Sequence, residues 1–311
     1  MARRKRGRPI SGWLILDKNY DVGSTEAVSA ARRLYDAKKA GHAGTLDPLA
    51  TGILPIAFGE ATKTVPYVQD GEKTYRFGAR FGVATSTDDA EGEIITRSDV
   101  RPDTDDIIAA LDWFTGHIEQ RPPAFSAVKI GGERAYDLAR AGEEVELQAR
   151  PAFVREFRLI SRESPDVALF EARTGKGVYV RSLVRDLAVA LGAVAHVSSL
   201  RRTAVGPFTE EDAVKLSDIE GLESIEERDA ELLGLEAALG DLPRARIDRG
   251  AAARLARGQS CVLAPADARG VRAGTSGRLE AVYVECDDAP VAICALDGLA
   301  LEPFRVFGGA G

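Results

Sequence analysis

The pattern of apolar and polar positions predicts helices and strands that are interspersed along the chain. Residues 12–17 form an apolar run that predicts a buried strand, and residues 73–82 alternate as half-buried strands do. Between them, apolar residues recur at helical spacing, and Ser24 or Thr25 is placed to cap the helix. Gly41 is placed to end that helix, which we expect to reach about residue 39.

The rest of the chain continues this mixed pattern. Thr104 is placed to cap a helix that Gly116 ends, and the acidic residues 209–241 have a helical composition. Further strands are expected at residues 153–160 and 167–173, and further helices at about residues 133–140, 182–191 and 251–257. Because helices and strands do not alternate strictly, we predict an α+β fold with a mixed, largely antiparallel central sheet flanked by helices.

Shifts in composition divide the chain into three predicted parts. Residues 1–10 form a basic N-terminal tail, residues 11–243 form the main domain, and residues 244–311 form a small β-rich domain. Paired prolines and paired glycines mark an inserted arm at about residues 121–151 within the main domain. A turn at residues 174–177 is expected to lead through a short strand into the following helix.

Charge permits a nucleic-acid partner, although the whole chain of 311 residues carries a formal charge of −7. Residues 209–241 hold 12 acids and 2 bases, so their charge of −10 leaves +3 for the remainder. Local charge decides whether a phosphate backbone can dock. Two basic clusters are candidates for such docking, unless they are merely solvated surface: Arg3, Arg4, Lys5, Arg6 and Arg8, and then Lys176, Arg181, Arg185, Arg201 and Arg202.

Other features bound the class of protein. The three cysteines, Cys261, Cys286 and Cys294, form no CxxC pair, which favours a reducing compartment. The sequence has no run of about 18 apolar residues, so no membrane span is predicted. The basic N-terminus lacks the apolar stretch of a secretory signal. We therefore expect a soluble, cytoplasmic protein with no membrane partner.

The densest cluster of glycines and polar residues is the loop at residues 41–48, GHAGTLDP. Two glycines three positions apart allow the backbone to approach a ligand closely. Asp47 followed by Pro48 has two readings, a helix N-cap or a reactive carboxylate. The Walker loop, HExxH and GxSxG patterns are absent from the sequence, and its three histidines lack ligand spacing, so no metal site is predicted.

Residues 41–63, GHAGTLDPLATGILPIAFGEATK, closely resemble the signature of the TruB family of pseudouridine synthases. Further matching segments follow in order, and they are KTYRF with Tyr75, TDDAEGE with Asp89, GKGVYVRSLVRDL with Tyr179 and Arg181, and HVSSLRRTAVGPF with Leu200 and Arg202. The resemblance implies the pseudouridine synthase fold for residues 11–243. It also implies a PUA-like RNA-binding domain for residues 244–311.

The resemblance implies isomerisation of uridine to pseudouridine at position 55 in the tRNA T loop, after the uridine is flipped out. Asp47 would be the catalytic carboxylate, acting as a nucleophile or a base near the ribose, with Arg181 keeping it ionised. Tyr75 would stack on the base or assist proton transfer, although the same position suits an ordinary strand residue. No cofactor is implied, because the reaction involves no redox change and no outside group.

Five further residues would bind the substrate. The resemblance implies that His42 holds the flipped arrangement, Leu200 walls the base pocket and Tyr179 packs beside the Asp47–Arg181 pair. Asp89 would accept hydrogen bonds from the flipped nucleotide, unless it is one acid in a solvated loop. Lys63 is either structural or a phosphate contact. The arm would close on the RNA, although its bases are offset by acids.

Two alternative functions remain at this point. A pseudouridine synthase of guide-RNA complexes shares the core signature, but we expect it to carry a larger C-terminal domain and to depend on partner proteins. An RNA-folding chaperone would bind the same RNA, and its activity would survive Asp47→Asn. We favour a stand-alone enzyme that binds the tRNA T stem-loop as a monomer, with no obligatory protein partner.

Overall fold

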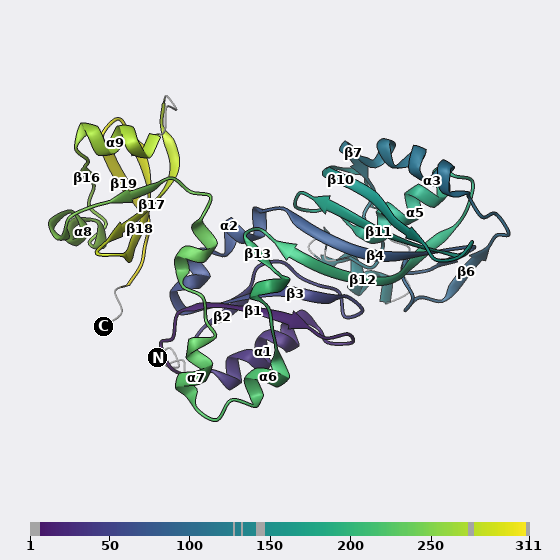
Figure 1. The fold of residues 1–311 in the computed structure, drawn as a ribbon, viewed down its shortest axis with the longest axis horizontal. Helices are drawn as coiled ribbons and strands as arrows, with labels where there is room; N and C mark the ends of the chain where they lie inside the picture. Colours follow the sequence, from purple (N-terminus) through teal and green to yellow (C-terminus); the bar gives the residue numbers. More distant parts are fainter. Residues whose placement is uncertain (1–6, 127, 132, 141–146, 273–276, 309–311) are drawn as a thin grey trace.

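Two separate β-sheets organise the fold, as Figure 1 shows. The computed structural model describes residues 7–126, 128–131, 133–140, 147–272 and 277–308. Residues 3–6 of the basic N-terminal tail and the acidic residues 143, 144 and 146 of the predicted arm lie outside these ranges. Among the described residues, no helix is both long and apolar enough to cross a membrane.

The larger sheet has ten strands and runs in the order β14-β1-β3-β12-β4-β11-β10-β7, with β2 beside β3 and β13 beside β12. Only the β1–β14 and β3–β12 pairs are parallel, so the predicted α+β class with a largely antiparallel sheet is confirmed. The strands are β1 (Gly12–Lys18), β2 (Ala40–His42), β3 (Thr51–Phe58), β4 (Lys73–Phe81), β7 (Gly116–Gln120), β10 (Arg150–Arg162), β11 (Val167–Thr174), β12 (Ala195–Val205), β13 (Phe208–Thr209) and β14 (Val214–Lys215).

Helices cover this sheet in two groups (Figure 1). Helices α3 and α5 pack over β10, β4 and β12, whereas α1 and α6 pack by β1 and β3. Phe77, Phe157 and Phe170 fill the first interface, with ring centroids 5.5 to 5.9 Å apart. The helices are α1 (Ser24–Leu34), α2 (Val65–Asp70), α3 (Thr104–Leu111), α4 (Ala135–Arg140), α5 (Val180–Ala190), α6 (Leu216–Glu220) and α7 (Ile225–Ala230).

Short elements complete the first part of the chain. Two hairpins lie outside the main sheet, and 3₁₀ turns connect the longer elements. They are β5 (Val83–Thr85) with β6 (Ile94–Arg97), β8 (Lys129–Ile130) with β9 (Glu133–Arg134), and the turns η1 (Gly59–Lys63), η2 (Asp112–Phe114), η3 (Glu210–Asp212) and η4 (Leu235–Leu239).

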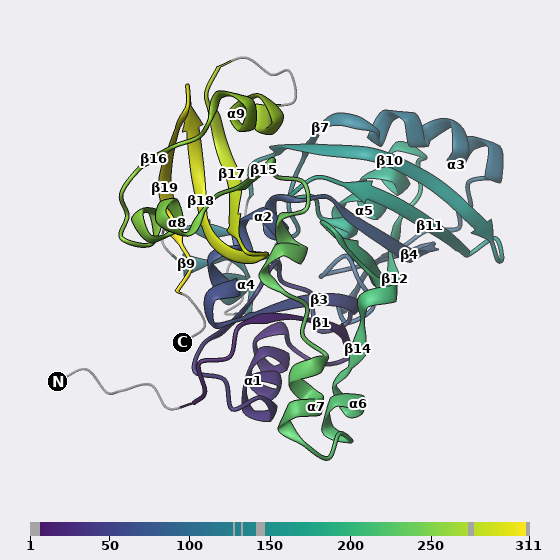
Figure 2. The same ribbon diagram turned by 60° about the vertical axis from the view of Figure 1, so that its left-hand side comes forward.

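The smaller sheet has five strands in the order β15-β17-β18-β19-β16, and both views place it beside α2 (Figures 1 and 2). It shares a buried apolar cluster with the larger sheet, which contains Trp13, Phe208, Tyr283, Ile293 and Phe307. Its elements are β15 (Arg244–Arg246), α8 (Arg249–Ala256), β16 (Cys261–Val262), α9 (Pro265–Arg272), β17 (Leu279–Cys286), β18 (Ala289–Asp297) and β19 (Ala300–Val306). The division of the chain at residues 243–244 stays a prediction.

The predicted ends of α1 are wrong. Gly23 is the N-cap, and the side chain of Ser24 instead exchanges hydrogen bonds of 2.8 Å with both backbone groups of Leu46. The helix ends at Leu34, because the chain turns at Asp36 with φ +42°. Gly41 lies in β2. The partner of Ser24 is distant in the sequence, so local spacing could not reveal it.

Other boundaries also differ from the prediction. Asp103, not Thr104, caps α3, and its carboxylate accepts from the Asp106 amide at 2.9 Å. Helix α5 begins at Val180, and a turn rather than a strand precedes it. The acidic segment 209–241 contains only short helices and turns joined to β13 and β14.

Candidate active site

Asp47 lies in the connection between β2 and β3. These strands pair antiparallel, so the connection returns the chain to the centre of the large sheet. No helix follows Asp47. Its carbonyl accepts instead from the Ala50 amide at 3.1 Å, and Pro48 and Leu49 form a turn. The helix-cap reading of the Asp-Pro step is therefore wrong, and the carboxylate is free for other contacts.

Arg202 holds the backbone of this loop. Its guanidinium donates to the carbonyls of Ile53 at 2.8 Å, Thr45 at 3.2 Å and Gly44 at 3.0 Å. Arg202 is 1% exposed, and burial lowers the pKa of its guanidinium. Gly52 makes the approach possible: its φ is +96°, and a Cβ there would lie 2.2 Å from the Arg202 carbonyl oxygen.

Lys18 supports the loop from the other side. The ammonium at the end of β1 donates to the carbonyls of Asn19 at 2.9 Å, Val22 at 2.8 Å and Pro48 at 3.1 Å. Burial lowers the pKa of Lys18 to about 8, and the nearby charge of Asp47 acts in the opposite direction. The connection that carries Asp47 is thus held by two buried donors, Arg202 and Lys18.

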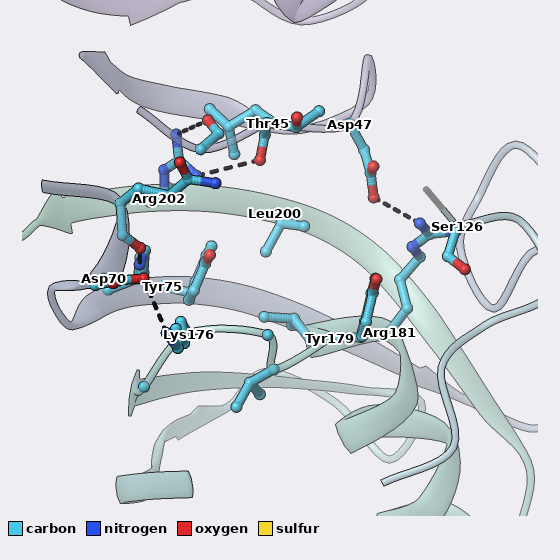
Figure 3. A pocket seen from close by; sticks show the side chains of 18 residues that line it. Thr45, Asp47, Asp70, Tyr75, Ser126, Lys176, Tyr179, Arg181, Leu200 and Arg202 are labelled. Carbon is cyan, nitrogen blue, oxygen red and sulfur yellow. Dashed lines mark hydrogen bonds and ion pairs between the residues drawn. The ribbon is translucent and has the colours of Figure 1, made fainter. Parts of the chain in front are cut away.

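Arg181, in the first turn of α5, joins two carboxylates. Its Nη2 lies 2.8 Å from Asp47 Oδ2, and its Nη1 lies 3.4 Å from Asp89 Oδ2. Arg181 and Asp89 are buried, whereas the Asp47 side chain is 38% exposed. Figure 3 shows the Asp47–Arg181 pair at one end of the cleft. The arginine therefore connects an accessible carboxylate to a buried one.

The rest of the Arg181 guanidinium is bonded to backbone. It donates to Thr87 O at 3.1 Å and to Phe125 O at 2.9 Å, which fixes the start of the arm against α5. The side chain of Gln120 exchanges hydrogen bonds with both backbone groups of Tyr179, at 2.8 and 3.1 Å. Because the Arg181 Nη2 that faces Asp47 also donates to Phe125 O, and Nη1 donates to Thr87 O, the ion pair has little freedom to rotate.

These residues border a cleft of about 570 Å³. Of the predicted site residues, Asp47, Tyr75, Tyr179, Arg181 and Leu200 line it, and the close-up shows Tyr75, Tyr179 and Leu200 between its two ends (Figure 3). Strand register brings Tyr75 and Leu200 together, because β4 and β12 pair Phe77 with Leu200 and Tyr75 with Arg202. Burial raises the pKa of Tyr179.

The other three predicted residues do not line the cleft. His42 lies on β2, its buried Nδ1 has no hydrogen-bond partner in the described part of the chain, and burial lowers its pKa. Asp89 is 1% exposed behind Arg181. Lys63 donates to Glu60 at 2.6 Å and to the Val306 carbonyl at 2.7 Å, so it bridges to the smaller sheet.

Among the described residues, several members of the predicted basic clusters are bonded to protein partners. Arg202 and Arg181 are buried, and the Arg201 guanidinium pairs with Asp17 at 2.9 Å and Glu210 at 2.6 Å. Arg8 pairs with Asp229 at 2.7 Å. A sequence shows charge but not the carbonyls and carboxylates that meet it, so phosphate binding by these arginines stays a prediction.

Sequence reasoning missed the structural roles of Lys18, Gln120 and Arg202. One signal was present for Arg202. It lies two residues after Leu200, and along a strand this spacing puts both side chains on the same face. No comparable signal marked Gln120, whose partner lies 59 residues away. In the described residues, no group of three or more His, Cys, Asp or Glu is placed to hold a metal ion.

Comparison with known proteins places this geometry in a family. Residues 32–180 match the TruB family pseudouridylate synthase N-terminal domain, and residues 181–248 match the tRNA pseudouridylate synthase B C-terminal domain. A tRNA pseudouridine synthase B from a Caulobacter species is 50% identical over 308 residues, which cover 99% of each chain. The chain belongs to the TruB family of pseudouridine synthases.

Other relatives agree with this TruB-family assignment. The tRNA pseudouridine synthase B of Rhizobium meliloti is 54% identical over 273 residues, covering 86% of this chain and 88% of the relative. A chain from the crystal structure of a Cbf5-Nop10-Gar1 complex superposes with a TM-score of 0.72 at 28% identity. That match covers 96% of this chain and 85% of the other. Pseudouridine synthases are isomerases, and so is this TruB-family chain.

Proposed function

We propose that this protein isomerises uridine to pseudouridine in tRNA, at position 55 of the T loop, with Asp47 as the catalytic carboxylate. The observation that carries the proposal is the exposed Asp47 carboxylate, held 2.8 Å from buried Arg181 at the end of a cleft. Relatives named tRNA pseudouridine synthase B match almost the whole chain, which supports tRNA as the substrate.

The chemistry requires one bond to break and another to form. The C1′–N1 bond is cleaved, the uracil rotates, and C5 bonds to C1′; C5 then loses a proton and N1 gains one. Asp47 acts either on C1′ as a nucleophile or on the C2′ hydrogen as a base. In both cases it must be an anion, and the guanidinium of Arg181 stabilises that state without blocking the carboxylate, which stays open to the cleft.

The target uridine must leave the stacked loop to reach Asp47, because the carboxylate lies inside a cleft. Tyr75 and Leu200 are placed to receive the flipped base, with Tyr75 as a stacking surface. Tyr179 packs beside the ion pair. Asp89 is buried, so in this arrangement it acts on the substrate through Arg181 rather than by direct contact.

The remaining assignments concern the surroundings of the site. His42 would contact the tRNA loop as it opens. Lys63 is structural in this arrangement, because its ammonium is bonded to Glu60 and Val306. We further propose a catalytic domain at residues 11–243, a PUA-like RNA-binding domain at residues 244–311, and a monomeric cytoplasmic enzyme without an obligatory protein partner. The near full-length match to relatives favours this over the guide-RNA alternative.

The test is to incubate unmodified tRNA with the wild type and with Asp47→Asn, and then to map pseudouridine chemically. We expect product at the T-loop uridine from the wild type and a rate at least about 10⁴-fold lower from the variant. Asp99→Asn, an exposed aspartate far along the chain, is the matched control and should keep full activity. Product at another uridine would refute the substrate, and a fully active Asp47→Asn would refute the mechanism.

A further inference from the structure

The cleft has a second end, opposite the Asp47–Arg181 pair. Figure 3 shows Asp70 and Lys176 there, beyond Tyr75 and Leu200. Gln69, Lys73, Gly175 and Gly177 also belong to the lining of the cleft. The reaction proposed above uses only the end that holds Asp47. The cations at the far end therefore need an explanation of their own.

Lys73 is the notable cation at this end. It lies on β4 two residues before Tyr75, so both side chains face the cleft. Its ammonium is buried and donates to the Gln69 carbonyl and to the Gly71 carbonyl at 2.6 Å, close to the end of α2. Among the described residues, no carboxylate lies within ion-pair distance of Lys73. A third N–H thus remains for another acceptor.

The carboxylate whose charge acts on Lys73, that of Asp70, is already engaged. Asp70 pairs with Lys176 at 3.0 Å on the rim of the cleft. Burial first, and then the charges of Arg202 and Lys176, lower the pKa of Lys73 to about 8, while Asp70 acts in the opposite direction. A buried ammonium without an anion is destabilised, and an incoming anion would remove that cost.

We propose that Lys73, with Lys176 at the rim, forms a subsite for the phosphodiester next to the flipped nucleotide. This inference rests on the proposed function, since it takes RNA as the ligand. An RNA strand that inserts one nucleotide beside Asp47 must carry its flanking phosphates along the same cleft. In nucleic-acid complexes, lysine ammonium groups commonly donate hydrogen bonds to phosphate oxygens. The turn at Gly175–Gly177 leaves room there, because a Cβ at Gly177 would meet no atom within 4 Å.

The test measures binding rather than turnover. In an Asp47→Asn background, the Kd is measured for a synthetic T stem-loop RNA with normal phosphates, and for two versions with a neutral methylphosphonate on the 5′ or 3′ side of the target uridine. We expect one of these versions to bind about tenfold more weakly. With Lys73→Met added, the normal RNA should bind about tenfold more weakly, and that methylphosphonate should cost nothing further.

Lys215→Met, an exposed lysine on β14, is the matched control and should keep the full methylphosphonate effect. Lys73→Arg retains the charge and serves if Lys73→Met does not fold; it should keep most of the affinity and the methylphosphonate effect. If the losses from Lys73→Met and from both methylphosphonates simply multiply, Lys73 only caps α2 and the subsite is refuted.

Proton uptake provides a second readout that a purely structural lysine would not change. Because the pKa of Lys73 in the free protein is about 8, Lys73 is partly deprotonated at pH 8.5, and binding of the RNA phosphate should take up a fraction of a proton. Calorimetry in buffers of different ionisation enthalpy should detect this uptake, and Lys73→Met should abolish it. Equal uptake in both proteins would overturn the proposal. Pseudouridine formation by the wild type is scored separately, so a failed subsite and a failed function give different results.

Discussion

Two buried arginines border the cleft, and their partners differ in kind. Arg181 meets the carboxylates of Asp47 and Asp89, together with two backbone carbonyls. Arg202 donates to three carbonyls in and after the Asp47 loop, and no carboxylate among the described residues lies within ion-pair distance of it. The first arrangement orients a charge, whereas the second fixes the path of the backbone that carries the charge. One residue type thus performs two tasks in the same site.

The largest effect that separates these tasks is expected from Arg181→Met. It would leave buried Asp89 without its cation, so we expect kcat to fall about 10³-fold and the free energy of unfolding to fall by about 3 kcal/mol. Single-turnover kinetics and chemical denaturation measure the two quantities. Arg181→Lys keeps the charge and should recover part of the stability but little of the rate. A variant with wild-type kcat would contradict the role given to the ion pair.

Arg202→Met should have a smaller effect on rate and a comparable effect on stability. Its loss leaves the carbonyls of Gly44, Thr45 and Ile53 without a donor, which should lower the free energy of unfolding by about 3 kcal/mol and kcat about 100-fold. Faster amide hydrogen exchange at residues 43–50 would show that the loop has loosened. Unchanged exchange together with a lower kcat would instead indicate direct action on the substrate.

Asp89→Asn should sharpen the comparison with a smaller change. The amide keeps the shape but removes one of the two charges on Arg181, so we expect kcat to fall about thirtyfold. Binding of the tRNA in an Asp47→Asn background should remain close to normal, because Asp89 is buried behind Arg181. A large loss of affinity would show that Asp89 contacts the nucleotide directly, as the sequence suggested.

The smallest expected effect concerns Lys18 and pH. Its pKa of about 8 lies below that of an unfolded lysine, so between these values the unfolded state binds more protons. Stability therefore rises with pH in this window. From pH 8 to pH 9 the wild type should gain about 1 kcal/mol relative to Lys18→Met, measured by urea denaturation. Parallel curves for the two proteins would contradict the burial of a titrating ammonium.

Much of the fold followed from periodicity, and the site followed from the family signature. The strand at residues 73–82 was predicted almost to its ends, because alternation alone defines a half-buried strand. The predicted start of α1 was wrong because the side chain of Ser24 bonds to Leu46, 22 residues further along the chain. The roles of Arg202 and Gln120 also depend on tertiary partners. Signature residues indicate chemistry, but they do not reveal which arginine holds a carboxylate and which holds a loop.

The apolar cluster shared by the two sheets also affects how the chain unfolds. Trp13 lies in β1, whereas Tyr283 and Ile293 come from the smaller sheet, and all three are buried in one cluster. Detaching the smaller sheet would expose this cluster to water and forfeit its packing. We therefore expect the two sheets to lose their order together, in one cooperative transition.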